Sequence, residues 1–293
     1  MPAIITTLFL LQLCASWHTI GQVGELPSRI DESSGIAFSR RYPDRVYHVN
    51  DSGDVGSLFI TDRAGKNLRE VKIRGFDPVD VEDLGMAPCG DGRSCIVIAD
   101  VGNNDLDRRA VELIFVEEVD RFPDSVRPLK RVRIRYPGQA YDSESVAVHP
   151  DGTILLLTKN SREGTAQLFK LSSGQWSTSD GAVQQLSHAG AIDLKKVFPD
   201  VFLLLRSPTS MDISEDGRRL LILTYQDAVE FALDLSKAEV VFNPVRIRLR
   251  ALQQQEAAAY VPGEHAFVYT TESMLLFRSP LMKVSCAQPG LNR

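Results

Sequence analysis

The sequence places polar side chains at matching positions of five similar segments. In each segment a short strand-like stretch begins with an acidic or hydroxyl residue and continues with small and apolar residues. The residues at the start of this stretch are Ser34, Glu82, Glu144, Thr209 and Glu256. The residues at the end of the following stretch are Asp51, Asp100, Lys159, Tyr225 and Glu272. If the segments are copies of one folding unit around a common axis, both sets gather near one end of that axis.

Carboxylates gathered in this way repel one another unless protons or a cation neutralise them. Asp83 and Asp142 lie beside the glutamates in the sequence and add to the negative charge. Oxygen ligands in an irregular arrangement suit Ca²⁺ better than Mg²⁺. The sequence therefore predicts a divalent cation, with Ca²⁺ expected, bound by residues of the set Glu82, Asp83, Asp100, Asp142, Glu144 and Glu256. A small ligand is predicted to contact the set Asp51, Lys159, Tyr225 and Glu272.

Two other interpretations of these carboxylates stay open. In the first, their role is structural: they accept hydrogen bonds from backbone N–H groups, from Lys159 or from arginines, and so join neighbouring units. Alternatively, a bound cation with an open coordination position would make the protein a hydrolase of an ester, lactone or phosphate monoester. The sequence has no Gly-x-Ser-x-Gly motif and no phosphate-binding glycine loop. Four scattered histidines, His48, His149, His188 and His265, are predicted to be turn or surface residues.

The elements that position these residues are predicted to be strands. Each opening stretch is followed by a turn, several of which contain Asp-Gly, and then by a continuous apolar run such as residues 154–157 or 220–223. Continuous apolar runs of this length are typical of strands that are buried on both faces. A third strand follows in each unit, at residues 275–277 in the last one. Alternating arginines at residues 131–135 and 245–250 indicate charged outer edge strands.

Four strands in each unit predict an all-β fold, a β-propeller with five four-stranded blades. Six blades are the alternative, with the extra blade hidden in residues 191–205. The last unit lacks an evident fourth strand, and residues 22–30 are expected to supply it. Pairing of the two ends of the chain would close the ring and remove the exposed sheet edges.

The first 22 residues carry no charged side chain, and residues 3–13 form a mostly apolar run. This pattern predicts a signal peptide at residues 1–22 and a single domain at residues 23–293, in a secreted or periplasmic protein. A buried N-terminal strand is the alternative. The apolar run falls short of the ~20 residues that a membrane-spanning helix needs. A net charge of −5 without basic clusters argues against a nucleic-acid partner, and we expect a monomer.

Removal of residues 1–22 would leave three cysteines. Cys89 and Cys95 flank a short glycine-containing turn and are predicted to form a disulfide, since the further ligands needed for a zinc site are missing. Cys286 is then expected to be an unpaired thiol.

Short motifs spread over the chain resemble those of a family of exported bacterial β-propellers of the NHL/SMP-30-like type, which have no assigned activity. The matching motifs are at residues 34–37, 50–53, 81–84, 89–95, 98–102, 142–145, 158–159 and 223–225. The chain departs from the family pattern at Val81, Asn103 and Ser273. The resemblance implies a propeller fold and export, but it assigns no catalytic residue, because a fold does not define a function.

Overall fold

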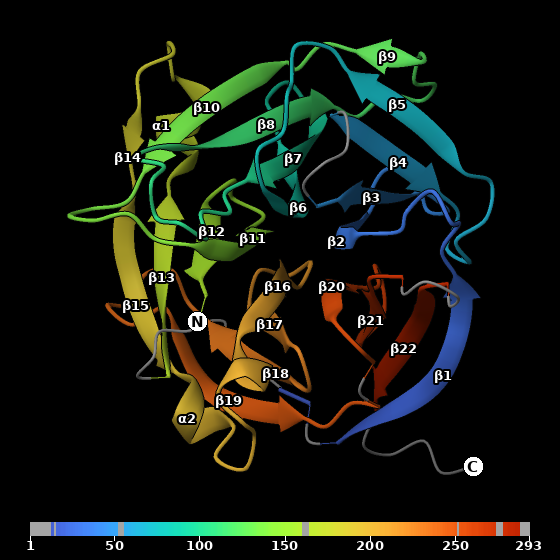
Figure 1. Ribbon diagram of the computed structural model, residues 1–293, viewed down its shortest axis with the longest axis vertical. Coiled ribbons are helices and arrows are strands. Elements are labelled where there is room, and N and C mark those ends of the chain that lie inside the picture. The colour runs from blue at the N-terminus through green and yellow to red at the C-terminus, as the bar shows by residue number, and fades with distance from the viewer. Residues whose placement is uncertain are drawn as a thin grey trace, which may run out of the picture.

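The protein is a five-bladed β-propeller. The computed structural model describes residues 13–14, 16–51, 56–159, 164–250, 252–273 and 278–287, and its sheets surround a common axis (Figure 1). Five sheets are present in these residues, each with four antiparallel blade strands, and two of them carry a short fifth strand. The predicted fold class is confirmed, with five blades and not six.

In the first four blades the four main strands follow one another along the chain from the axis outwards, apart from the short strands β9 and β14 that intervene. Blade 1 contains β2 (Ser33–Phe38), β3 (Val46–Asn50), β4 (Ser57–Thr61) and β5 (Arg69–Ile73). Blade 2 contains β6 (Val81–Pro88), β7 (Ser94–Asp100), β8 (Val111–Glu117) and β10 (Lys130–Arg135). Blade 3 contains β11 (Ser143–Val148), β12 (Ile154–Thr158), β13 (Thr165–Leu171) and β15 (Ser187–Asp193). Blade 4 contains β16 (Pro208–Ile213), β17 (Arg219–Thr224), β18 (Ala228–Leu233) and β19 (Val241–Ile247).

Blade 5 joins the two ends of the chain. It contains β20 (Gln255–Tyr260), β21 (Ala266–Thr271), β22 (Pro280–Cys286) and, outermost, β1 (Trp17–Glu25). An N-terminal strand closes the ring as expected, but it spans residues 17–25, so only residues 22–25 of the predicted 22–30 belong to it. The third strand expected at residues 275–277 lies outside the described residues, and β22 is the strand that pairs with β21.

Small residues on the inner strands allow the blades to approach the axis closely. A methyl group added to Gly35 of β2 would lie 2.8 Å from the backbone nitrogen of Leu84 in β6. One added to Gly85 would lie 3.0 Å from the Val148 side chain of β11. The middle strands are buried on both faces, as their continuous apolar sequences predict. The hydrophobic core consequently lies between neighbouring blades rather than at one centre.

The remaining elements are short. A parallel strand β9 (Ser125–Val126) lies beside β5, and β14 (Gln184–Gln185) lies beside β10. Helices α1 (Ser173–Ser177) and α2 (Leu194–Val197) and the 3-10 helix η1 (Leu204–Arg206) lie in connections. Residues 191–205 thus finish β15 and form short helical turns, where a sixth blade was the alternative. Among the described residues, no helix is long and apolar enough to cross a membrane.

The charged outer strands have partners of their own. Arg131 of β10 forms a salt bridge with Glu112 of β8, at 2.5 Å, and Arg246 of β19 forms one with Asp227, also at 2.5 Å. In blade 2 the prediction of an outermost strand is wrong, because β14 lies outside β10. These arginines hold outer strands to their neighbours.

Two disulfides are present, and one of them was not predicted. The Cys89–Cys95 pairing is confirmed, with the two Cα atoms 5.8 Å apart. The expectation of a free thiol at Cys286 is wrong, since Cys286 is bonded to Cys14 with a Cα–Cα distance of 5.7 Å. The reason is ring closure, because β1 pairs with β22 and brings position 14 to the end of the chain. A cut after residue 22 would remove Cys14 and most of β1.

One histidine prediction also fails. His48 is 0% exposed in β3, and its Nε2 lies 2.9 Å from Oγ1 of Thr61. Burial lowers the pKa of His48 to about 3, so this ring stays neutral in the core. A histidine in a strand flanked by apolar residues is here a packed core residue.

Candidate functional site at the acidic channel mouth

The register of the blades brings the predicted polar positions to one end of the propeller channel. The first residue of each inner strand pairs with the last residue of the second strand, as Ser143 with Thr158 and Gln255 with Thr271. The opening carboxylates and the residues that follow the second strands therefore share one mouth, which we call the acidic mouth. Within it, two sets of carboxylates have oxygens that all lie within 4.8 Å of one another. These sets are Asp51, Asp80 and Glu82, and Glu82, Asp142 and Glu144.

Glu82 is the residue that the two sets share. It is 7% exposed, and among the described residues it makes no hydrogen bond and no salt bridge. Burial raises its pKa well above the usual range, and the nearby Glu144 raises it further. A buried carboxylate without a donor is costly, and a proton or a cation is the usual remedy.

Asp80 is a site residue that the sequence analysis missed. It directly precedes β6, and its carboxylate oxygen lies within 4.8 Å of those of Asp51 and Glu82. The Asn104 side chain donates a hydrogen bond to Asp80 at 3.3 Å. Burial and the Asp51 carboxylate raise the pKa of Asp80. The same spacing in Asp142-Ser143-Glu144 was the sequence signal that could have identified it.

Gly102 packs directly against two of these carboxylates. A methyl group at this position would be 2.3 Å from Cγ of Asp80 and 2.4 Å from Oε1 of Glu82. Real side-chain contacts essentially never come this close. The absence of a side chain at Gly102 therefore leaves the space that the carboxylates of Asp80 and Glu82 occupy.

Lys159 supplies the positive charge of the second set. Its ammonium forms a close ion pair with Glu144, and it lies 3.6 Å from an oxygen of Asp142. Burial raises the pKa of Glu144, and the ammonium limits that rise to about 7. Burial also lowers the pKa of Lys159, but Glu144 and Asp142 outweigh this and raise it overall. The set of Glu82, Asp142 and Glu144 thus already contains a tethered cation.

Glu256, Glu272 and Tyr225 form a separate proton-rich group at the same mouth. Burial raises the pKa of Glu256 to about 9, and both the charge of Glu272 and a hydrogen bond with it contribute. Burial and the neighbouring Glu256 raise the pKa of Tyr225. The raised pKa of Glu256 favours its protonated form at neutral pH, in which the carboxyl group can donate a hydrogen bond to Glu272. These residues lie outside the two carboxylate sets that could hold a metal ion.

Two of the predicted cation ligands, Asp83 and Asp100, bind protein groups. Asp83 is 0% exposed and accepts hydrogen bonds from the backbone N–H groups of Leu84, Val146 and Met211, so it joins blades 2, 3 and 4. Asp100 accepts from the N–H of Asp80 at 3.1 Å and forms a salt bridge of 2.8 Å with Arg108. The contacts of Asp83 and Asp100 therefore agree with the structural role that the sequence analysis left open.

A cavity lies at the opposite mouth of the channel. It encloses about 670 Å³ and is lined by the far ends of the inner strands, including Phe38, Ile213 and Tyr260. None of the residues of the acidic mouth lines it.

Comparison with known proteins gives a fold and no family. No family model matches the chain, and no curated protein matches it. Among solved structures, a glucose dehydrogenase superposes with a TM-score of 0.52 at 11% identity, covering 93% of this chain and 100% of that one. A luciferin-regenerating enzyme gives a TM-score of 0.44 at 12% identity, with 94% and 96% covered. A structure of a nidogen/laminin complex gives 0.49 at 15% identity, with 87% and 86% covered.

At these identities the similarity shows the propeller fold alone, since one fold hosts many activities. The closer resemblance to exported bacterial propellers stays a prediction.

Proposed function

We propose that the acidic mouth binds a divalent cation through Asp51, Asp80 and Glu82, with Ca²⁺ as the expected ion. The observation that carries this proposal is Glu82, a buried carboxylate with no donor among the described residues, whose oxygen lies within 4.8 Å of those of Asp51 and Asp80. Lys159 compensates Asp142 and Glu144, whereas neither Asp80 nor Glu82 has a salt bridge in the described part of the chain. An all-oxygen set of this kind favours Ca²⁺.

The protein then acts as a binding module, in which the cation and the polar groups around it hold a small ligand. Lys159, Tyr225 and Glu272 lie around the carboxylates and offer a positive charge, a phenol and a carboxyl group. A hydrolase is the second candidate function. The protonated Glu256 favours it, because a carboxylic acid near a cation is a suitable proton donor to a leaving group.

A Ca²⁺ titration by calorimetry, with a thermal melt in Ca²⁺ or chelator, tests the cation site. Binding to the native state must raise the melting temperature. We expect Glu82→Gln to abolish this rise. The matched control Glu239→Gln removes an exposed carboxylate in the turn between β18 and β19 and should leave the rise intact. An unchanged melting temperature of the unaltered protein at millimolar Ca²⁺ would refute the proposal.

A panel of esters, lactones and phosphate monoesters separates the two functions. An enzyme should show a Ca²⁺-dependent hydrolytic rate that falls in Glu256→Gln. A binding module should bind Ca²⁺ and show no turnover of any member of the panel.

We also propose that the protein functions outside the cytoplasm. Two disulfides support this, because such bonds persist in oxidising compartments. Since a cut after residue 22 would break ring closure, we place the end of any leader before Cys14. Mass spectrometry of the exported chain tests both statements.

A further inference from the structure

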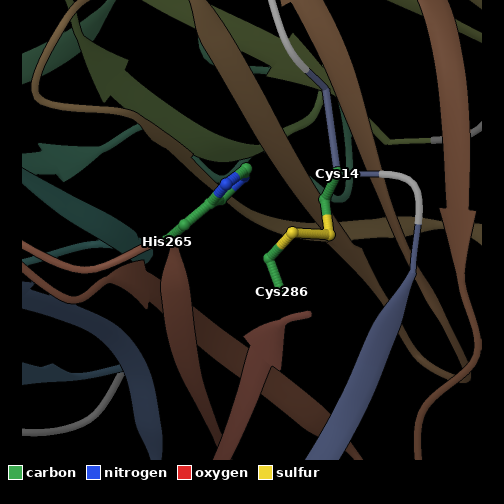
Figure 2. Close-up of side chains that lie close together, drawn as sticks. All are labelled: Cys14, His265 and Cys286. Atoms are coloured by element: carbon green, nitrogen blue, oxygen red, sulfur yellow. A yellow bond between two sulfur atoms is a disulfide. The ribbon is translucent and has the colours of Figure 1, made fainter. Parts of the chain in front are cut away.

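A second group of side chains with potential metal-ligand atoms lies where the N-terminal segment meets β22. The sulfurs of Cys14 and Cys286 and a ring nitrogen of His265 all lie within 4.8 Å of one another. Figure 2 shows the imidazole of His265 beside the disulfide that joins the two cysteines. We call these three residues the clasp.

Buried contacts hold the clasp in place. Cys14 is 2% exposed, and its backbone N–H donates a hydrogen bond to Oε2 of Glu230 at 3.2 Å. The other oxygen of Glu230, itself 0% exposed, accepts from the Tyr260 hydroxyl at 2.8 Å and lies 3.4 Å from Nε2 of His265. The Trp17 ring meets the imidazole edge to face, with 5.2 Å between centroids. His265 is thus oriented by a carboxylate and an aromatic ring.

This arrangement has the chemistry of a soft metal site. Two thiolates and one imidazole are ligands that Zn²⁺ prefers, and three protein ligands leave the fourth position open for water. A carboxylate that contacts a ring nitrogen of a ligating histidine is the usual outer support of such a site. The 670 Å³ cavity provides an entry path, because His265 is part of its lining.

We propose that the clasp alternates between a disulfide and a metal-bridged form, in which Cys14, Cys286 and His265 bind one Zn²⁺ after reduction. A dithiol transfers two electrons and two protons to the disulfide and is itself oxidised to a disulfide, leaving two thiols. Zn²⁺ then displaces both thiol protons to solvent and binds the neutral imidazole. Either form ties the N-terminal segment to β22 and keeps the ring closed.

The second disulfide of the chain is an internal control. Cys89 and Cys95 are also close together, but in the described residues they belong to no group of three or more potential metal ligands. Reduction of that pair should therefore create no site of comparable affinity, since two ligands from a short turn do not complete a zinc site.

The test uses the full chain with Cys89→Ser and Cys95→Ser. The protein is reduced with dithiothreitol, the dithiothreitol is removed under anaerobic conditions, and Cd²⁺ is then titrated in. Absorbance from thiolate-to-cadmium charge transfer reports this site alone, because the acidic mouth has only oxygen ligands. We expect one Cd²⁺ per chain and the release of two protons. His265→Ala should weaken binding by about tenfold or more, and the oxidised protein should show no such absorbance.

Three results would overturn the proposal: no charge-transfer absorbance in the reduced chain, equal affinity in His265→Ala, or a mature chain that lacks Cys14. Circular dichroism of each reduced variant shows whether it is folded. If His265→Ala fails to fold, the reduced protein with only Cys89→Ser and Cys95→Ser is melted with and without Zn²⁺. The proposal requires that Zn²⁺ raise its melting temperature. An unchanged melting temperature then overturns the proposal.

Discussion

Neighbouring residues of the same chemical type have opposite roles at the acidic mouth. Glu82 and Asp83 are adjacent and both buried, yet Asp83 accepts three backbone N–H groups and Glu82 accepts none in the described residues. Successive side chains of a strand point to opposite sides, so one turns towards backbone donors and the other towards carboxylates. The cost of an unmatched charge therefore falls on Glu82, which makes it the most informative residue to mutate.

A methyl group at Gly102 should disrupt the cation site. In Gly102→Ala the added carbon would meet the carboxylates of Asp80 and Glu82 at 2.3–2.4 Å, so both must move. We expect Ca²⁺ affinity, measured by calorimetry, to fall by roughly tenfold or more, which corresponds to a loss of about 1.4 kcal/mol or more of binding free energy. Gly174→Ala is the control, because a methyl group there meets nothing within 4 Å. Equal Ca²⁺ affinity in both variants would contradict the assignment.

Removal of the tethered ammonium should create a second cation site. In Lys159→Met the carboxylates of Asp142 and Glu144 lose the ammonium that compensates their charge, while an oxygen of each lies within 4.8 Å of one of Glu82. We expect a lower melting temperature in chelator and more than one Ca²⁺ bound per chain, counted by calorimetry. A stoichiometry that stays at one, with unchanged stability, would show that Lys159 does not stand in for an ion.

At the scale of elements, closure of the ring is the critical event. The outermost strand of blade 5 comes from the N-terminus, and its pairing with β22 covers a sheet edge that would otherwise be exposed. The disulfide of Cys14 with Cys286 lies at the end of this pairing and spans 272 positions, whereas that of Cys89 with Cys95 spans 6.

The two disulfides should therefore differ in their effect on stability. In the chain-entropy account, cross-linking the longer loop contributes about 5 kcal/mol and the shorter one about 2 kcal/mol. We expect Cys14→Ser with Cys286→Ser to lower the free energy of unfolding more than Cys89→Ser with Cys95→Ser does, as measured by denaturant titration. The reverse order would mean that strand pairing alone closes the ring.

At the scale of the whole molecule, the acidic mouth should make stability depend on pH. Burial raises the pKa of Glu144 to about 7 and that of Glu256 to about 9, from an ordinary value of 4.5. The folded state thus binds more protons than the unfolded state between these values, so stability falls as pH rises from about 4.5 to about 9.

Ca²⁺ should oppose this loss, because it replaces the missing protons at Glu82 and its neighbours. We expect the melting temperature in chelator to decrease between pH 5 and pH 9, and the increase produced by Ca²⁺ to grow over the same range. Melts at fixed ionic strength measure both trends. A Ca²⁺ effect that shrinks with rising pH would place the ion elsewhere.

The sequence alone determined the blade. Asp-Gly turns, runs such as residues 154–157 and small inner-strand residues are local signals, and five repetitions of them specified five copies of one unit. The same alignment predicted Glu82, Asp142 and Glu144 as neighbours, because equivalent positions around an axis must converge. The sequence also predicted the Cys89–Cys95 disulfide, because a short glycine-containing turn can bring the two cysteines within bonding range.

The tertiary structure alone decided which of these carboxylates have partners. Asp83 and Asp100 look like Glu82 in the sequence, but donors from other blades and loops satisfy them. The pairing of Cys14 with Cys286 depends on where β1 meets β22, which no local pattern encodes. Strand propensities and turns are short-range properties, whereas hydrogen-bond partners and ring closure arise from contacts between residues far apart in the chain, and these exist only once the blades are assembled.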